Sequence, residues 1–133
     1  MTLETTATRW IEEIWRPGDL ATYDDLHAPH FLNHSPDPPG DRASYRQSIV
    51  ELYAAFPDFY TTIDDLVIDE AAGKVAIRWM ATGTHRGNFA GIAPTGRWIT
   101  FRGIEIIRVE RDQLVERWGE WDGEAILEQL TEV

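Results

Sequence analysis

The sequence predicts an α+β fold in which helices pack on one face of a curved, mostly antiparallel sheet of four strands. Two observations carry this prediction. Apolar residues recur at helical spacing through residues 4–56, and from residue 58 onward they recur with a period close to two, interrupted by short turns. Helices followed by consecutive antiparallel strands are typical of α+β proteins. The 133 residues suit a single domain spanning 1–133.

Three helices are expected before the sheet. Residues 4–16 carry tryptophans, isoleucines and an alanine on one face, and residues 20–26 form a short second helix. The Pro-rich stretch 27–41 is predicted to be a loop. Asp41 is placed to cap a third helix over 42–56, which ends at a proline.

Four strands and a last helix follow. The strands are expected over 58–69, 75–86, 97–109 and 113–122, and the helix over 124–131. Four long strands that curve around helices leave a cone-shaped hollow between the two layers. A hollow of this kind is a natural site for a small molecule.

The composition argues against several classes of function. A net charge of −11 disfavours binding to nucleic acid or to an anionic membrane, because both need clustered Lys and Arg. The chain has no cysteine, which excludes disulfides, thiolate catalysis and cysteine-ligated metals. No apolar run is long enough to span a membrane, and the N-terminus does not resemble a signal peptide. We therefore expect a soluble cytoplasmic protein.

Glu105 is the main candidate for proton transfer. It lies among isoleucines in the strand over 97–109 and shares a face with Phe101. An apolar environment disfavours the ionised carboxylate, which suits a general acid or base near neutral pH. The alternative is an exposed face on which Glu105 is merely solvated. Arg78, in the middle of another strand, is its predicted partner, because a buried and unpaired arginine is costly.

The histidines allow more than one interpretation. His34 follows Asn33 in FLNHSP, and the two could polarise or orient a carbonyl group, or could only tie the loop to the backbone. His85, at the end of a strand, is a second candidate with a structural role favoured. His27, His30 and His34 are not expected to hold zinc, because they lie in a loop broken by prolines.

The segment VERWGEWDGE, residues 115–124, joins the last strand to the last helix. Asp122 is expected to cap that helix, and a role in the pocket is possible in addition. Trp118 and Trp121 have opposite parity on the strand, so one should face the core and the other the far face of the sheet. An aromatic residue on the far face suggests that a second subunit covers it.

Two stretches resemble a known family. FLNHSP and RWMATGTHRGNFAGIAPTGRWITFRGIEIIRVERDQLVERWGEWD are similar to the SnoaL-like polyketide cyclases, also called ester cyclases, and the likeness extends over about residues 8–130. The resemblance implies the cone-shaped fold of nuclear transport factor 2 and, in many members, a homodimer with packed sheets. It also implies ring closure of an aromatic polyketide by intramolecular aldol condensation, without cofactor or metal.

The sequence departs from the family pattern at both residues that the resemblance implicates in catalysis. An aspartate is expected on the last strand, where this chain has Gly119, and a histidine on the preceding strand, where it has Glu105. We expect Gly119 to leave a hole beside Glu105, which would then supply the carboxylate. Arg78 would pair with Glu105 or hold an anionic group.

Three hypotheses follow. The first is a cofactor-free acid/base enzyme acting on a hydrophobic, polyketide-like carbonyl compound, with Glu105 transferring the proton. The expected walls of its pocket are Trp10, Phe101, Trp118 and Trp121. The second is a non-catalytic binding protein that uses the same pocket, which the missing aspartate favours. The third is an isomerase or hydrolase, since one fold supports many reactions.

Overall fold

The computed structural model describes residues 2–16, 20–35 and 39–132. The elements run in the order α1 (Leu3–Trp10), η1 (Ile11–Trp15), α2 (Tyr23–Leu26), β1 (His27–Asn33), β2 (Gly40–Asp41), α3 (Arg42–Ala55), β3 (Tyr60–Asp69), β4 (Lys74–Thr84), β5 (Trp98–Glu110), β6 (Gln113–Trp121) and α4 (Gly123–Thr131). The strands form one sheet in the order β2-β1-β6-β5-β4-β3, in which only β1 and β6 are parallel. The α+β prediction is confirmed, with six strands in place of four.

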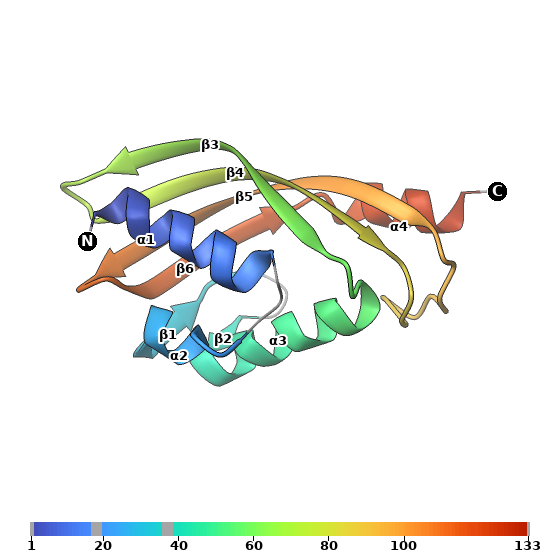
Figure 1. Ribbon diagram of the computed structural model, residues 1–133, viewed down its shortest axis with the longest axis horizontal. Coiled ribbons are helices and arrows are strands. Elements are labelled where there is room, and N and C mark those ends of the chain that lie inside the picture. The colour runs from blue at the N-terminus through green and yellow to red at the C-terminus, as the bar shows by residue number, and fades with distance from the viewer. Residues whose placement is uncertain (1, 17–19, 36–38, 133) are drawn as a thin grey trace.

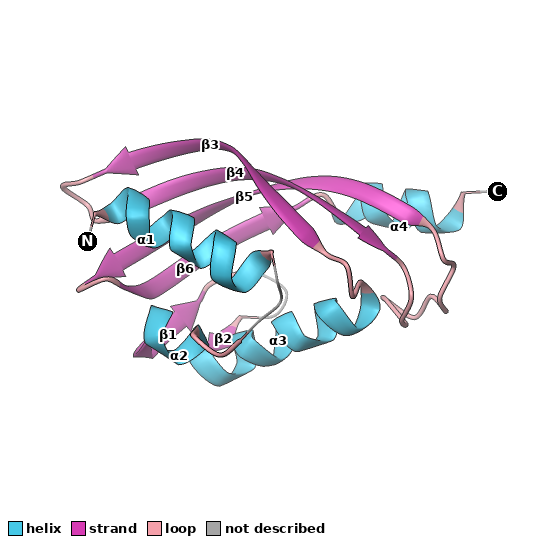
Figure 2. Ribbon diagram, in the orientation of Figure 1, coloured by secondary structure: helices cyan, strands magenta, loops and turns pink. Residues whose placement is uncertain are grey.

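Helices α1 and α3 lie on the same side of the sheet, and the long strands β3 to β6 curve over them (Figure 1). Helix α4 lies at the far end of the sheet, beside the start of β5 (Figure 2). The core fills the space between the two layers and includes fully buried aromatic residues from both. No helix in the described part of the chain is both long enough and apolar enough to cross a membrane.

The predicted cap of the third helix is confirmed. The side chain of Asp41 accepts a hydrogen bond from the backbone N–H of Ser44 at 2.9 Å, so it satisfies one of the free donors at the start of α3. The same bond stabilises the ionised carboxylate and lowers the pKa of Asp41. Helix α3 then brings Tyr45, Ile49 and Leu52 to the core.

The first predicted helix changes from α-helix to π-helix after Trp10. After α1, residues Ile11–Trp15 form η1, one turn of π-helix, whose hydrogen bonds close a wider ring than those of an α-helix. In an α-helix, side chains five residues apart point about 140° apart. The wider turn brings Trp10 and Trp15 closer to one side, and their rings meet edge-on at 6.1 Å. Both tryptophans therefore point toward the sheet.

The prediction of a loop over 27–41 is wrong in part, because β1 and β2 lie within it. Proline lacks a backbone donor, so Pro29 argues against a strand in the middle of a sheet. The pairing of β1 with β6 is irregular between His27 and Leu32, and Pro29 lies in that interval. The irregularity removes the need for a donor at Pro29, and β1 therefore forms between β2 and β6.

The register of the sheet decides which side chains face the helices. Glu105 on β5 is directly opposite Ile77 on β4 and Gly119 on β6, and all three are buried. The neighbouring positions Arg78 and Ile104 point to the outer face, away from the helices, and are exposed. The inner face of three adjacent strands thus places Glu105 near the middle of the sheet, toward α1, η1 and α3.

Candidate functional site

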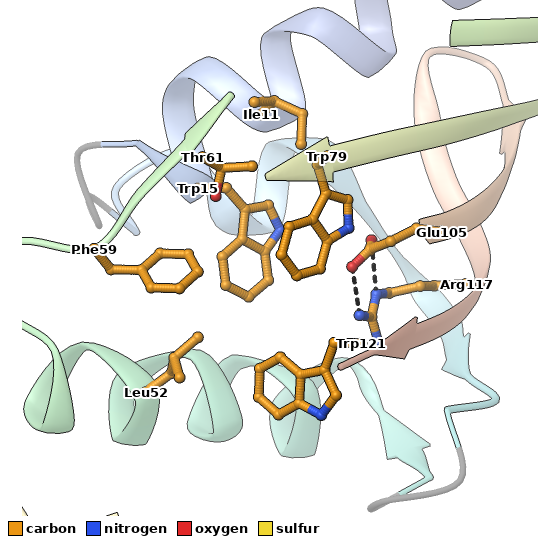
Figure 3. Close-up of a pocket in the computed structure, with 9 residues that line it drawn as sticks. All are labelled: Ile11, Trp15, Leu52, Phe59, Thr61, Trp79, Glu105, Arg117 and Trp121. Atoms are coloured by element: carbon orange, nitrogen blue, oxygen red, sulfur yellow. Dashed lines mark hydrogen bonds and ion pairs between the residues drawn. The ribbon is translucent and has the colours of Figure 1, made fainter. Parts of the chain in front are cut away.

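The inner face of the sheet and the helices enclose two adjoining hollows, with volumes of about 30 Å³ and about 110 Å³. The residues that line both are Trp15, Leu52, Trp79, Arg117 and Trp121. We call the two hollows together the cavity, and Figure 3 shows the residues that line the smaller one. Aromatic and aliphatic side chains predominate around the smaller hollow, which the 4% exposed Glu105 reaches, while several polar residues line the larger one. The structure therefore places Glu105 on the inner face, at the wall of the smaller hollow.

Glu105 is paired with Arg117, not with Arg78. The Nε and Nη2 atoms of Arg117 donate to the two carboxylate oxygens of Glu105 at 3.0 Å and 2.6 Å. The predicted Arg78–Glu105 pair is wrong, because Arg78 is exposed on the outer face of β4 and Glu105 is buried on the inner face of β5. Arg117 and Glu105 are diagonal neighbours across β5 and β6, within reach of long side chains.

The guanidinium group of Arg117 contacts Asn33 and Tyr45 in addition to Glu105. Its Nη1 donates to the side-chain oxygen of Asn33 at 2.9 Å, and its Cζ lies 4.8 Å from the centre of the Tyr45 ring. Burial alone would lower the pKa of Arg117, but the negative charge of Glu105 outweighs it and raises the pKa. Burial raises the pKa of the Tyr45 phenol, which stays neutral beside the pair. The pair therefore carries one positive and one negative charge and no net charge.

Gly119 does not leave the expected hole beside Glu105. A Cβ atom at Gly119 would lie 2.7 Å from Cζ of Arg117, so the guanidinium group fills the space that a side chain at 119 would take. The prediction of an open approach for substrate at this point is wrong for that reason. Gly119 still borders the larger hollow, next to Asn33 and Arg117.

His34 is on the opposite face of the sheet from Glu105. Its Nε2 lies 2.7 Å from a carboxylate oxygen of Glu116, and its ring stacks on Trp118 at 4.9 Å. Lys74 lies over the same Trp118 ring at 5.0 Å. The structure therefore separates His34 and Trp118 from the cavity, while Asn33, one residue before His34, points into it.

The predicted walls divide into two groups. Trp121 lines both hollows and is 45% exposed, so it lies at their mouth, and Phe101 packs behind it with ring centres 5.8 Å apart. Trp10 is fully buried outside the cavity, and its indole N–H donates to Nε2 of His27 at 3.1 Å. The opposite parity of Trp118 and Trp121 is confirmed.

Asp122 and His85 have structural roles. The side chain of Asp122 accepts a hydrogen bond from the backbone N–H of Ala125 at 3.0 Å, which confirms it as the cap of α4. His85 is fully buried, and its Nδ1 accepts a hydrogen bond from the backbone N–H of Thr95 at 3.1 Å. Neither residue lines the cavity. His85 instead fixes the base of the loop between β4 and β5.

Sequence reasoning missed Arg117, Trp15, Trp79 and Tyr45 as residues of the site. A signal for Arg117 was present, because positions 117, 119 and 121 share a face of the last strand, and Gly119 was already placed beside Glu105. Nothing in the sequence indicated the wide turn that directs Trp15 inward. Within the described residues, no three His, Asp or Glu side chains are grouped as a metal site would need.

Sequence comparison decides the family. The model of the SnoaL-like polyketide cyclase family matches residues 5–130. The chain belongs to the SnoaL-like polyketide cyclases. No curated protein matches its sequence. Among solved structures, IdmH of Streptomyces antibioticus, a proposed polyketide cyclase, is 31% identical with a TM-score of 0.87, and the match covers 98% of this chain and 99% of IdmH.

Two further structures resemble this SnoaL-like protein. A proposed polyketide cyclase of Acidithiobacillus ferrooxidans is 28% identical with a TM-score of 0.83, over 96% of this chain and 93% of the other. AclR of Streptomyces galilaeus, a proposed hydroxylase, is 24% identical with a TM-score of 0.88, over 98% of this chain and 82% of AclR. The likeness to AclR concerns the fold alone. Membership in the family associates the chain with polyketide cyclases.

Proposed function

We propose that this SnoaL-like protein is a cofactor-free acid/base enzyme that acts on a hydrophobic, polyketide-like carbonyl compound. The observation that carries the proposal is the buried carboxylate of Glu105, which reaches the cavity among aromatic side chains and is held in one orientation by Arg117. The reaction is an aldol cyclisation or a related isomerisation. Both begin when a base removes a proton from the carbon next to a carbonyl group. The protonated base then returns that proton, to another carbon in an isomerisation or to the alkoxide formed when the enolate attacks a second carbonyl group of the substrate in an aldol cyclisation.

In this proposal Glu105 is the base. Its carboxylate takes the proton, the electron pair of the C–H bond becomes the C=C bond of an enolate, and the carbonyl oxygen takes the negative charge. Each oxygen of Glu105 accepts one bond from Arg117, which leaves a lone pair on each for the proton. Asn33 acts through Arg117, since its side-chain oxygen fixes the guanidinium group. His34 and Arg78 take no part, because both lie on the outer face.

Hydrogen–deuterium exchange at the α-carbon of 2-tetralone in D2O, followed by NMR, tests the proposal. The wild-type protein should accelerate the exchange, and Glu105→Gln should abolish the acceleration. Glu116→Gln is the matched control, because Glu116 belongs to the outer face and pairs there with Arg108. Exchange in Glu105→Gln at the wild-type rate would refute Glu105 as the base.

The second candidate function is a non-catalytic binding protein for a hydrophobic small molecule. The bidentate Glu105–Arg117 pair favours it, because such a pair can serve structure alone. The same experiment separates the two functions. A protein that binds 2-tetralone but leaves its α-protons unexchanged is a binding protein, while hydrolysis of an ester probe in place of exchange would indicate a hydrolase.

We further propose that the protein is a homodimer joined through the outer face of the sheet. Val67, Ile104 and Ile106 are exposed by 63%, 50% and 41%, and register places all three on that face. An apolar patch of this kind on a sheet favours a partner. Light scattering should give the mass of a dimer, and Ile104→Glu should give a monomer. A wild-type monomer at micromolar concentration would contradict the proposal.

A further inference from the structure

The cavity contains a hydrogen-bond donor with nothing to donate to. Trp79 is 6% exposed, and its Nε1 is buried without a hydrogen-bond partner among the described residues. An indole N–H can only donate, and leaving it unpaired in a buried position is unfavourable. Native proteins pair nearly all such groups, so an unpaired donor at a cavity wall requires an explanation.

Trp79 is fixed in its position by its neighbours. It lies opposite Gly103 on β5, where a Cβ atom would be 2.7 Å from Cε2 of the indole, so the ring occupies the space above the glycine. Phe101 meets the indole edge-on, with ring centres 5.6 Å apart. The indole is therefore packed from two sides, and its nitrogen is not free to turn toward another acceptor.

The nitrogen of Trp79 points to the part of the cavity where chemistry is proposed. Trp79 and Glu105 are diagonal neighbours on the inner face, since Ile77 lies opposite Glu105 and Trp79 follows two residues later. Figure 3 shows the indole nitrogen on the side of the ring that faces the carboxylate. Both residues line the smaller hollow. A ligand in the larger hollow whose carbonyl end enters the smaller one would contact the donor and the base together.

Two other buried polar atoms of the cavity are less informative. The Nε1 atom of Trp15 and the hydroxyl of Tyr45 also lack a hydrogen-bond partner within the described ranges. The two rings are neighbours, 6.3 Å apart between centres, and the indole N–H of Trp15 opposes the burial that raises the pKa of the Tyr45 phenol. Each of these two polar groups therefore has the other as a polar neighbour. Trp79 is therefore the residue on which the inference rests.

We propose that the indole N–H of Trp79 donates a hydrogen bond to the carbonyl oxygen of the ligand and so makes the site selective for an acceptor at that point. The proposal rests on the proposed function, and it adds the residue that positions the oxygen. With the oxygen on Trp79, the α-carbon lies toward Glu105. When Glu105 takes the α-proton, the negative charge that develops on the oxygen is stabilised by the indole N–H. Trp79 is a specificity residue, while Glu105 remains the base.

Two bicyclic probes of the same shape test the proposal: 2-tetralone, which has a carbonyl group, and tetralin, which has none. The wild-type protein should bind 2-tetralone about tenfold more tightly than tetralin, the value expected for one net hydrogen bond. Trp79→Phe should remove that preference and leave the affinity for tetralin nearly unchanged. Trp98→Phe is the control, because Trp98 is 64% exposed and lies outside the cavity.

NMR gives a readout that packing alone would not change. The indole proton of Trp79, assigned by its loss in Trp79→Phe, should move downfield on addition of 2-tetralone and stay in place with tetralin. If Trp79→Phe does not fold, 3-benzothienylalanine at position 79 replaces the N–H with sulfur and keeps the ring. That variant should lose the preference for the ketone.

Three results would overturn the proposal: a ketone preference that survives at position 79 without the N–H, an indole signal that ignores the ketone, or a protein that binds neither probe. Failure of the proposed function gives a different result. If Glu105→Gln exchanges protons like wild type while the indole signal of Trp79 still responds to 2-tetralone, Trp79 recognises the oxygen and Glu105 is not the base.

Discussion

The guanidinium group of Arg117 lies over the backbone of Gly119, in the space that the Cβ atom of any other residue at this position would occupy. Glycine on the last strand is therefore what allows Arg117, two residues earlier on the same face, to reach the carboxylate of Glu105. The absence of a side chain at Gly119 and the buried ion pair of Arg117 with Glu105 are therefore parts of one arrangement.

Gly119→Ala should displace Arg117 from Glu105. The new methyl group overlaps the guanidinium carbon, so the ion pair lengthens or breaks and two largely buried charges lose their pairing. We expect a loss of roughly 2 kcal/mol in the free energy of unfolding, measured by urea denaturation. Gly123→Ala is the control, since the nearest atom to its Cβ is 3.9 Å away. Equal stability of the two variants would contradict this account.

Arg117→Met should leave Glu105 buried without a partner. Removing one member of a buried pair costs about 3–5 kcal/mol, whereas removing both is far less costly. The double variant Arg117→Met/Glu105→Gln should therefore be more stable than Arg117→Met alone in urea denaturation. Arg78→Met, on the exposed face of β4, should change stability by less than about 0.5 kcal/mol. If the double variant is no more stable than Arg117→Met, the unpaired charge on Glu105 is not the cause of the destabilisation.

Acid should destabilise the fold through His27. Burial lowers the pKa of His27 from its usual 6.5 to about 4, against the opposing effect of its hydrogen bond to the backbone oxygen of Tyr23. Between pH 6.5 and pH 4 the unfolded chain therefore binds a proton at His27 that the folded chain does not bind. The contribution of neutral His27 to the free energy of unfolding is complete above pH 6.5. It is lost as the pH falls toward 4. The loss amounts to about 3 kcal/mol.

Urea denaturation at pH 7.5 and pH 4.5 measures this effect. The loss of stability between the two pH values should be smaller in His27→Gln than in wild type. His30→Gln should show the full loss, because His30 is exposed. A pH dependence that is the same in all three proteins would mean that other groups are responsible.

Asp122→Ala should weaken α4 and leave the cavity intact. The lost bond to the N–H of Ala125 costs about 1 kcal/mol, and Asp122→Asn should retain most of that stability. Thermal unfolding followed by circular dichroism is the measurement. Both variants should bind 2-tetralone as wild type does, since Asp122 does not line the cavity. Lost binding in Asp122→Asn would place Asp122 in the site after all.

The sequence allowed the helices and the long strands to be predicted because each follows one period over many residues. β1 was missed because Pro29 indicates a loop, and only the irregular pairing with β6 makes the proline acceptable. The wide turn of η1 was missed for a related reason, since its apolar spacing also fits an α-helix. Local patterns do not reveal such irregularities, which depend on contacts distant in sequence.

The candidate site was predicted in part. Alternation along β5 groups Glu105 with Phe101 and Ile107, and all three are buried on the inner face. The partner of Glu105 was predicted wrongly. Arg78 was expected to be buried because it lies in the middle of a strand, but alternation alone does not say which face of a sheet is covered. His34 was misplaced for a similar reason: the residue after Asn33 points to the other face of the sheet.

The ion pair of Glu105 and Arg117 cancels its own charge, so from a distance a ligand experiences only the overall charge of −11. Organic acids in their ionised form are repelled as they approach, and this repulsion weakens as ionic strength rises. Uncharged ketones and esters approach without that barrier. A net charge of −11 therefore favours uncharged ligands over anionic ones at the encounter step, before any side chain of the cavity touches them.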